Sequence, residues 1–147
     1  MTSNRLAEAF LVRARARLAA LTALRDEADF TDIAREVRDI VDLCFRGILR
    51  IRGIEVSRWC DVGDVLEEHF AQFPPEISVH GERCIKFYRF LASAQESIPF
   101  PVSPNMSKLH TSGEVDATMA DAKWVLEIAQ LTVDILDHQR VPISQAP

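Results

Sequence analysis

The sequence predicts an all-α fold, an up-and-down bundle of four long helices and one short helix. Two stretches carry this prediction, residues 33–52 and 115–136, in which apolar residues recur every three or four positions as on one face of a helix. A third observation excludes the main alternative. The 147 residues contain no sustained apolar/polar alternation and no Asn-Gly or Asp-Gly hairpin turn. At this length we expect one helical domain spanning residues 1–147.

The first two helices are expected to fill most of residues 3–52. The first begins near Ser3, ends between Asp26 and Asp29, and is expected to use as its apolar residues Leu6, Phe10, Leu18, Leu21 and Leu24. Thr31 or Asp29 can cap the second helix, which runs to Arg52. Its apolar face comprises Ile33, Val37, Ile40, Val41, Cys44, Phe45, Ile48 and Leu49. Gly53 follows where a left-handed C-terminal cap is expected.

Two further helices follow a short link that carries Trp59. Asp61 is the expected N-cap of a third helix, from about Val62 to Gln72, which ends before Pro74-Pro75 because proline cannot continue a helix. The fourth helix is expected to span about 79–97 and to contribute to the core Cys84, Phe87, Tyr88 and Leu91.

The last part of the chain is expected to form a loop and a long fifth helix. Prolines and Gly113 predict a mobile loop over residues 98–113, and Thr111 with Glu114 forms a capping box. The helix carries a seam of seven apolar residues, Val115, Met119, Ala122, Leu126, Ala129, Val133 and Leu136, which is widened by Val125, Ile128, Leu131 and Ile135. So wide an apolar surface predicts two buried faces, one in the bundle and one against a second copy, and therefore a homodimer.

Composition and charge limit the classes of function. Hydrophobic residues make up 48% of the chain and the net charge is -5, so the protein is expected to fold and not to bind nucleic acid through bulk positive charge. A local basic patch stays compatible with that charge. Three cysteines form neither a disulfide framework nor a metal half-site, which favours a reducing compartment. There is no secretory signal pattern and no membrane-length apolar run, so we expect a cytoplasmic protein without a membrane partner.

The first candidate site is a set of cations on the fourth helix. Arg83, Lys86 and Arg89 follow one another at i,i+3 spacing and predict a basic ridge for phosphate oxygens. Tyr88 beside them is the kind of aromatic side chain that nucleotide or single-stranded RNA binding uses. The alternative is an ordinary solvated face, on which Glu82 pairs with Lys86.

The second candidate site lies at the end of the second helix. Its charged side chains alternate in sign along one line, which is typical of a self-pairing surface. Arg46 and Arg50 form the less compensated end, next to Arg52 and Arg58, and can meet an anion. Both sites are therefore predicted to bind a nucleotide or another phosphate.

The sequence predicts no catalytic residue, metal site or cofactor. The four histidines show no i,i+4 pairing and no H-E-x-x-H motif. Cys60 next to Asp61 is the one arrangement that suggests a nucleophile, but no histidine lies near it in the sequence and Asp61 is already explained as a cap.

Four further stretches are informative together, and they are LAEAFLVRARARLAAL, EVRDIVDLCFRGILRIRGIEV, RWCDVGDVLEEHF and FYRFLASAQESIPFP. They resemble the HEPN domain family (higher eukaryotes and prokaryotes nucleotide-binding). In the second stretch, Asp42 and Arg46 stand at the family's acid and base positions, with Arg where Lys is more usual. In the third stretch, Cys60 stands where the family usually has His.

The resemblance implies a bundle of four or five helices that commonly dimerises. Many family members are metal-independent RNases with an R-x4-6-H motif, and others are partners of minimal nucleotidyltransferases in two-component operons, often of toxin–antitoxin type. No Arg here stands five to seven residues before His69, His80, His110 or His138, so the motif is absent and no catalytic role is carried over.

The resulting hypothesis is a HEPN-like nucleotide- or protein-binding domain that forms a homodimer and acts as the non-catalytic partner of a minimal nucleotidyltransferase in a toxin–antitoxin-type system. One alternative is a divergent metal-independent RNase toxin that uses the Arg and Lys side chains of the fourth helix on RNA. Another is a purely structural interaction module, which fits the acidic net charge equally well.

Overall fold

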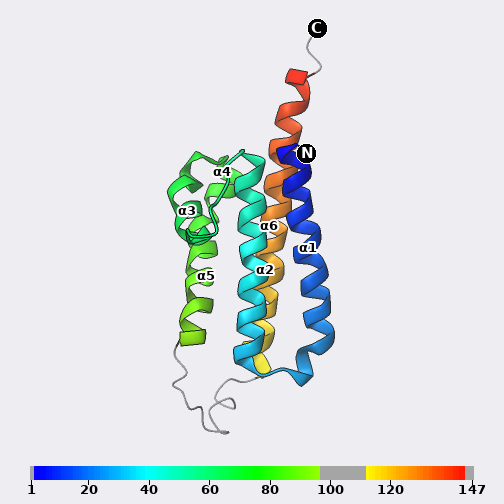
Figure 1. Ribbon diagram of the computed structural model, residues 1–147, viewed down its shortest axis with the longest axis vertical. Coiled ribbons are helices and arrows are strands. Elements are labelled where there is room, and N and C mark those ends of the chain that lie inside the picture. Colours follow the sequence, from blue (N-terminus) through cyan, green and yellow to red (C-terminus); the bar gives the residue numbers. More distant parts are fainter. Residues whose placement is uncertain (1, 97–111, 145–147) are drawn as a thin grey trace.

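The computed structural model describes residues 2–96 and 112–144, and within these ranges every regular element is a helix (Figure 1). The predicted all-α bundle is thus confirmed. In chain order the α-helices are α1 (Ser3–Leu24), α2 (Phe30–Ile51), α3 (Val62–His69), α4 (Pro75–Ser78), α5 (Gly81–Glu96) and α6 (Ser112–Ser144). Short 3-10 turns follow α1 and α3, at Arg25–Glu27 and Phe70–Gln72.

Helix α2 is the central element of the bundle. It contacts α1, α6, α5 and α3, and Figure 1 shows α1 on one side of it, α5 on the other and α6 behind. The long helices alternate in direction along the chain, while α3 and α4 cover one end of α5. Thirteen of the 22 residues of α2 are buried, including all eight of its predicted apolar face. The buried residues predicted for the fourth helix are confirmed as well, and they are Cys84, Phe87, Tyr88 and Leu91.

The predicted helix ends are largely confirmed. Asp29 caps α2 and Asp61 caps α3, each accepting a hydrogen bond from the backbone N–H three residues on, at 2.9 and 3.1 Å. Thr2 caps α1 in the same way. Gly53 has a φ of 79°, and the backbone N–H groups of Gly53 and Ile54 donate to the last carbonyls of α2. A side chain at Gly53 would be strained by that φ, so the turn after α2 depends on glycine.

The predicted apolar face of α1 is partly wrong. Leu24 is exposed, and the residues of α1 that are buried are Ala7, Leu11, Ala14 and Leu21. Two of these are alanines because α1 and α2 approach closely. A Cβ added at Gly47 of α2 would lie 3.0 Å from Leu11 Cδ2. The missing side chain at Gly47 leaves room for Leu11 and for the backbone of α1 at Ala7.

The stretch between α3 and α5 also differs from the prediction. The regular part of α3 ends at His69, and the expected turn up to Gln72 is 3-10. The helical stretch ends before Pro74-Pro75, as predicted. Pro75 then opens the short helix α4, which was not predicted, and its missing N–H costs nothing in the first turn. Helix α5 then begins at Gly81, two residues later than expected, and a Cβ at Gly81 would lie 2.7 Å from the Phe70 ring.

Helix α6 buries its apolar seam inside its own chain, with Val115 and Met119 half-buried and the other five seam residues buried. Val125 and Ile128, which belong to the second predicted face, are also buried, because α6 packs on both α1 and α2. Only Leu131 remains exposed among the widening residues, with Ile135 half-buried. The homodimer therefore stays a prediction, since the width of this apolar surface no longer requires a second copy.

Some predictions fall wholly or partly outside the described residues. The loop was predicted over 98–113, but Ser112 and Gly113 already belong to α6, and residues 98–111 lie outside the described ranges. Thr111, the proposed capping residue, lies outside them too. Along the described part of the chain, no helix combines the length and the apolar character that crossing a membrane requires.

Candidate binding cleft

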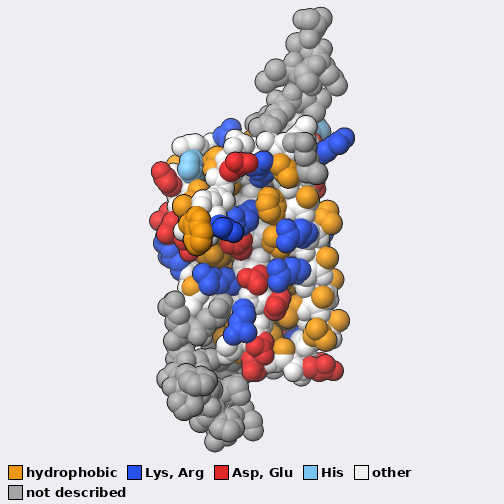
Figure 2. Space-filling model, in the orientation of Figure 1, with side chains coloured by type: hydrophobic (Ala, Val, Ile, Leu, Met, Phe, Trp, Pro, Cys, Tyr) orange, Lys and Arg blue, Asp and Glu red, His pale blue; other side chains and the backbone are white. Residues whose placement is uncertain are grey.

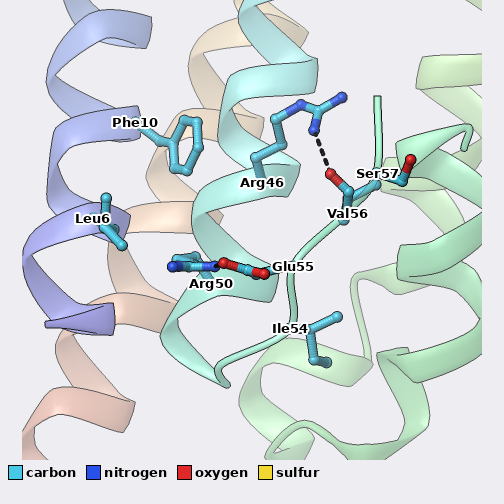
Figure 3. A pocket seen from close by; sticks show the side chains of 8 residues that line it. All are labelled: Leu6, Phe10, Arg46, Arg50, Ile54, Glu55, Val56 and Ser57. Carbon is cyan, nitrogen blue, oxygen red and sulfur yellow. Dashed lines mark hydrogen bonds and ion pairs between the residues drawn. The ribbon is translucent and has the colours of Figure 1, made fainter. Parts of the chain in front are cut away.

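One predicted basic pair lies in a cleft between α1, α2 and the segment that follows Gly53. The cleft has a volume of about 550 Å³ and is shown in Figure 3. Its walls are formed by Leu6 and Phe10 of α1, Arg46 and Arg50 of α2, and Ile54, Glu55, Val56 and Ser57 of the link. The volume lies in the range of small-molecule sites, roughly 300–1,000 Å³.

The backbone after α2 places the link, residues 54–57, alongside the end of α2 (Figure 3). Gly53 turns the chain sharply, so residues 54–57 run back along the end of α2 instead of away from it. Arg46 fixes this course, because its Nη1 donates a hydrogen bond of 3.4 Å to the Val56 carbonyl. The two arginines lie one helical turn apart and therefore face the same side of α2. The end of α2, the turn at Gly53 and the two arginines together form one side of the cleft.

Arg50 is the more available of the two cations. Its Nη1 lies 2.6 Å from Glu55 Oε1, and its Nε is buried without a hydrogen-bond partner. The Arg50 side chain is 21% exposed, whereas that of Glu55 is 76% exposed. Glu55 can therefore leave Arg50 and return to water at little cost, while Arg50 cannot leave the cleft wall. An incoming anion competes with a solvated carboxylate, not a buried one.

Arg46 is held more firmly. Its Nε lies 2.6 Å from Asp42 Oδ1, and both side chains are about three-quarters buried. Because Asp42 binds Nε and Val56 binds Nη1, the guanidinium has a fixed orientation at the mouth of the cleft. This arrangement positions positive charge, but Asp42 also offsets much of it.

The opposite wall of the cleft is apolar and continues along α1. Leu6 and Phe10 are half-buried, and in Figure 3 the Phe10 ring lies across from Arg46. Phe10 and Arg46 also line a neighbouring hollow of about 460 Å³, whose other lining residues are Arg13, Arg17, Asp39, Asp42 and Leu43. The cleft thus offers an aromatic and aliphatic wall facing two guanidinium groups, a combination that suits a ligand with a ring and an anionic group.

The second predicted group, on α5, is divided among different partners. Arg83 lies 3.2 Å from Asp121 of α6, Lys86 lies 2.9 Å from Glu82, and Arg89 binds Glu67 at 2.9 Å and Asp64 at 3.3 Å on α3. Residues six apart point about 120° away from each other around a helix, so Arg83 and Arg89 lie on opposite flanks. Arg83 and Lys86 line a groove of about 590 Å³ that does not include Arg89.

The interpretation of Tyr88 as a stacking platform is wrong. Its side chain is buried, its ring centroid lies 5.2 Å from that of Phe45, and the Arg38 guanidinium lies 5.5 Å from its centre. Burial raises the pKa of the Tyr88 hydroxyl, and the carboxylates of Asp42 and Asp61 raise it further. A core residue of this kind offers no face to a base.

Two features of these sites had no signal in the sequence. The Arg83 guanidinium lies 3.7 Å from the ring centre of Trp124, and Trp124 is far away along the chain. Phe10 was predicted only as one of the apolar residues of the first helix, and nothing in its helical spacing indicated the half-buried position beside Arg46. Both contacts arise from how whole helices pack, which local patterns do not encode.

The described residues offer little for covalent or metal chemistry. None of their His, Cys, Asp and Glu side chains form a group of three or more that suits a metal ion. Burial raises the pKa of the Cys44 and Cys84 thiols to about 12, so both stay protonated at neutral pH. Cys60 is exposed on the link.

Comparison with known proteins gives no family for this chain. No protein-family model, no curated protein and no solved structure matches it. The structure itself defines an antiparallel helical bundle (Figure 1). A cleft with basic and apolar walls lies at one end of its central helix.

Proposed function

We propose that this chain is a non-catalytic, HEPN-like binding domain whose ligand site is the cleft between α1, α2 and the link 54–57. The proposed ligand is a nucleotide, with its phosphate near Arg50 and Arg46 and its base against Leu6 and Phe10. The observation that carries the proposal is the Arg50–Glu55 pair, in which a mostly buried cation is balanced by a mostly exposed acid. A phosphate with several acceptor oxygens is a stronger partner for guanidinium than one solvated carboxylate.

The resemblance to HEPN domains adds a biological setting to the proposal. In that setting the domain is the partner of a minimal nucleotidyltransferase in a toxin–antitoxin-type pair and forms a homodimer. Asp42 and Arg46, the two positions that carry the resemblance in the second helix, form an ion pair at the mouth of the cleft. The RNase alternative gains no support from the geometry, because Arg89 does not share the groove of Arg83 and Lys86 and pairs instead with acids of α3.

Thermal unfolding with added nucleotides tests the site. A nucleotide that binds the folded chain alone stabilises it by about 2.7 kcal/mol at a hundred times its Kd, so AMP and ATP should raise Tm. Adenosine, which lacks phosphate, should not raise Tm. Arg50→Gln should abolish the response, whereas Arg35→Gln, in an exposed pair with Asp32 elsewhere on α2, should leave it intact.

Glu55→Gln gives a test in the opposite direction. Removing the competing carboxylate should tighten nucleotide binding by roughly three- to tenfold, because the phosphate no longer displaces an ion pair. No response to any nucleotide at millimolar concentration, or an equal response in Arg50→Gln, would contradict the proposal. Co-expression with the product of a neighbouring gene tests the partner independently, since a stable complex without nucleotide binding favours the interaction module.

A further inference from the structure

The outward face of α1 is apolar although no part of the described chain covers it. Ala9, Val12, Ala16, Ala20 and Ala23 recur at the spacing of one helical face, and all five are exposed. Val12 is 57% exposed, among the highest values for a large apolar residue here. Figure 2 shows the hydrophobic side chains following the outer edge of α1, at the right. The stripe extends over about 21 Å of helix.

This face is unusual because the opposite side of α1 is also apolar. Inward, α1 buries Ala7, Leu11, Ala14 and Leu21 against α2 and α6. A surface helix normally carries charged residues opposite its buried stripe, and a helix that is apolar on both sides is normally covered on both. The fold of this chain covers one side only.

The charged residues beside this face indicate the kind of partner that it can bind. Helix α1 contains four arginines and one acidic residue, in a chain whose net charge is -5. Arg13 and Arg15 flank the stripe on its two sides, and Arg5 lies at its N-terminal end. Arg5 and Arg13 make no ion pair and no side-chain hydrogen bond with the described residues, whereas Arg15 binds Gln130 of α6. The frame of the apolar stripe is therefore basic and partly uncompensated.

We infer that this face binds an acidic amphipathic helix of another protein. Such a helix lays small apolar residues along Ala9–Ala23 and places Asp or Glu beside Arg5, Arg13 and Arg15, which is the helix-to-helix mode that uses flanking charges for partner choice. The alanines allow close approach of the two backbones. Val12 is the one larger side chain of the stripe and can pack between side chains of the partner helix. This surface is separate from the cleft, so the inference goes beyond the proposed nucleotide site.

Two other occupants fit the face less well. A second copy of this chain, packed antiparallel across Ala16, brings the arginines of one α1 close to those of the other, which is repulsive. Single-stranded nucleic acid binds through aromatic platforms, and the exposed residues of α1 include no aromatic ring. Charge disfavours the first and side-chain type disfavours the second.

A pair of synthetic helical peptides tests the inference on the full chain. Both carry the same Ala/Leu face and match α1 in length, but one has Glu and the other Lys along its flanks. Fluorescence anisotropy should give a Kd for the Glu peptide at least about tenfold below that for the Lys peptide. Ala16→Glu, Ala20→Glu and Arg13→Glu should each weaken the Glu peptide about tenfold or more. Ala120→Glu, an exposed site on α6, is the matched control and should change nothing.

The outcomes separate the occupants. Equal affinity for the two peptides, no binding of the Glu peptide, or unchanged binding by both Ala16→Glu and Ala20→Glu overturns the inference. A wild-type chain that is dimeric by light scattering and becomes monomeric in Ala16→Glu assigns the face to a second copy, which also overturns it. Binding of a single-stranded oligonucleotide that depends on Arg13 but not on Ala16 overturns it as well. Circular dichroism confirms that each variant stays folded before its Kd is used.

Discussion

Helices α1 and α2 have the same length, 22 residues each, and lie side by side, but they differ in the kind of residue that they expose to solvent. Helix α2 is buried over most of its surface, and its exposed positions are charged, including Asp32, Arg35 and Asp39. Helix α1 is buried on one narrow stripe, and its outward face is mostly alanine with Val12. The charged side chains that Figure 2 shows interleaved over the middle of the molecule contrast with the hydrophobic edge of α1.

The difference separates residues that the fold requires from residues that it does not use. The buried residues of α2 pack against the neighbouring helices, so folding alone accounts for them. The outward face of α1 makes no contact that stabilises the bundle, and folding accounts for its helix-forming alanines but not for the lack of charge. The partner helix proposed above would account for the lack of charge.

The largest expected effect comes from adjacent residues of α1 that face opposite ways. Leu11 is fully buried against Gly47, so Leu11→Ala should lower the free energy of unfolding by about 2–5 kcal/mol. Val12 is exposed, and Val12→Ala should change it by no more than about 0.5 kcal/mol. Urea unfolding followed by circular dichroism measures both. Similar losses from the two substitutions would mean that the outward face is already packed.

The second prediction concerns the two buried thiols of α2 and α5. They should make the folded state less stable at alkaline pH. Burial raises the pKa of Cys44 and Cys84 to about 12 in the folded chain, while an unfolded thiol ionises near about 8.5. Between these values the unfolded state binds fewer protons, so stability is complete below about pH 8.5 and falls as pH rises towards 12. The expected slope is about 1.4 kcal/mol per pH unit for each thiol.

Urea unfolding at several pH values between 8 and 11 measures this slope. The double variant Cys44→Ala/Cys84→Ala is the control, because it removes both thiols and leaves the other titrating groups unchanged. Its slope should be shallower by the contribution of the two thiols. Identical slopes in wild type and double variant would show that the thiols do not differ between the folded and unfolded states.

The helix caps give a third, smaller contrast between α1 and α2. Asp29 caps the buried helix α2 with a 2.9 Å hydrogen bond, and Asp29→Ala should cost about 1 kcal/mol. Thr2 caps α1 with a 3.2 Å bond in an exposed first turn that can fray, so Thr2→Ala should cost less. Thermal unfolding of the two variants ranks them. A larger loss from Thr2→Ala would indicate that the start of α1 is more firmly packed than its exposure indicates.

The same contrast explains what the sequence predicts well. The buried face of α2 is predictable because large apolar residues such as Ile40, Phe45 and Ile48 stand at helical spacing among charges. The inner and outer faces of α1 cannot be told apart in that way, since Ala7 and Ala14 point inward while Ala16 and Ala20 point outward. Alanine stands on both sides, so at these positions only packing against α2 and α6 distinguishes the two faces.

The residues of the candidate site likewise differ in how well the sequence predicts them. Arg46 and Arg50 are predictable because both belong to one helix, where spacing fixes which side chains share a face. Glu55 and Phe10 are not predictable as their neighbours, because one depends on the turn at Gly53 and the other on the docking of α1. The basic ridge on α5 was too broad a prediction, since the acids that divide it come from α3 and α6.

The smallest expected effect tests whether the outward face of α1 contributes to the stability of the fold. Ala16→Glu places a charge at the centre of the exposed stripe, and in the isolated chain it should change the free energy of unfolding by no more than about 0.5 kcal/mol, because no described residue packs there. Leu126→Glu on α6, at a buried position, should unfold the protein, since an unpaired charge in a core costs several kcal/mol. Chemical denaturation of both variants compares them directly. A clear loss of stability from Ala16→Glu in the monomer would mean that this face already serves the fold. A neutral result would show that the fold does not depend on this face, which stays available to the proposed partner helix.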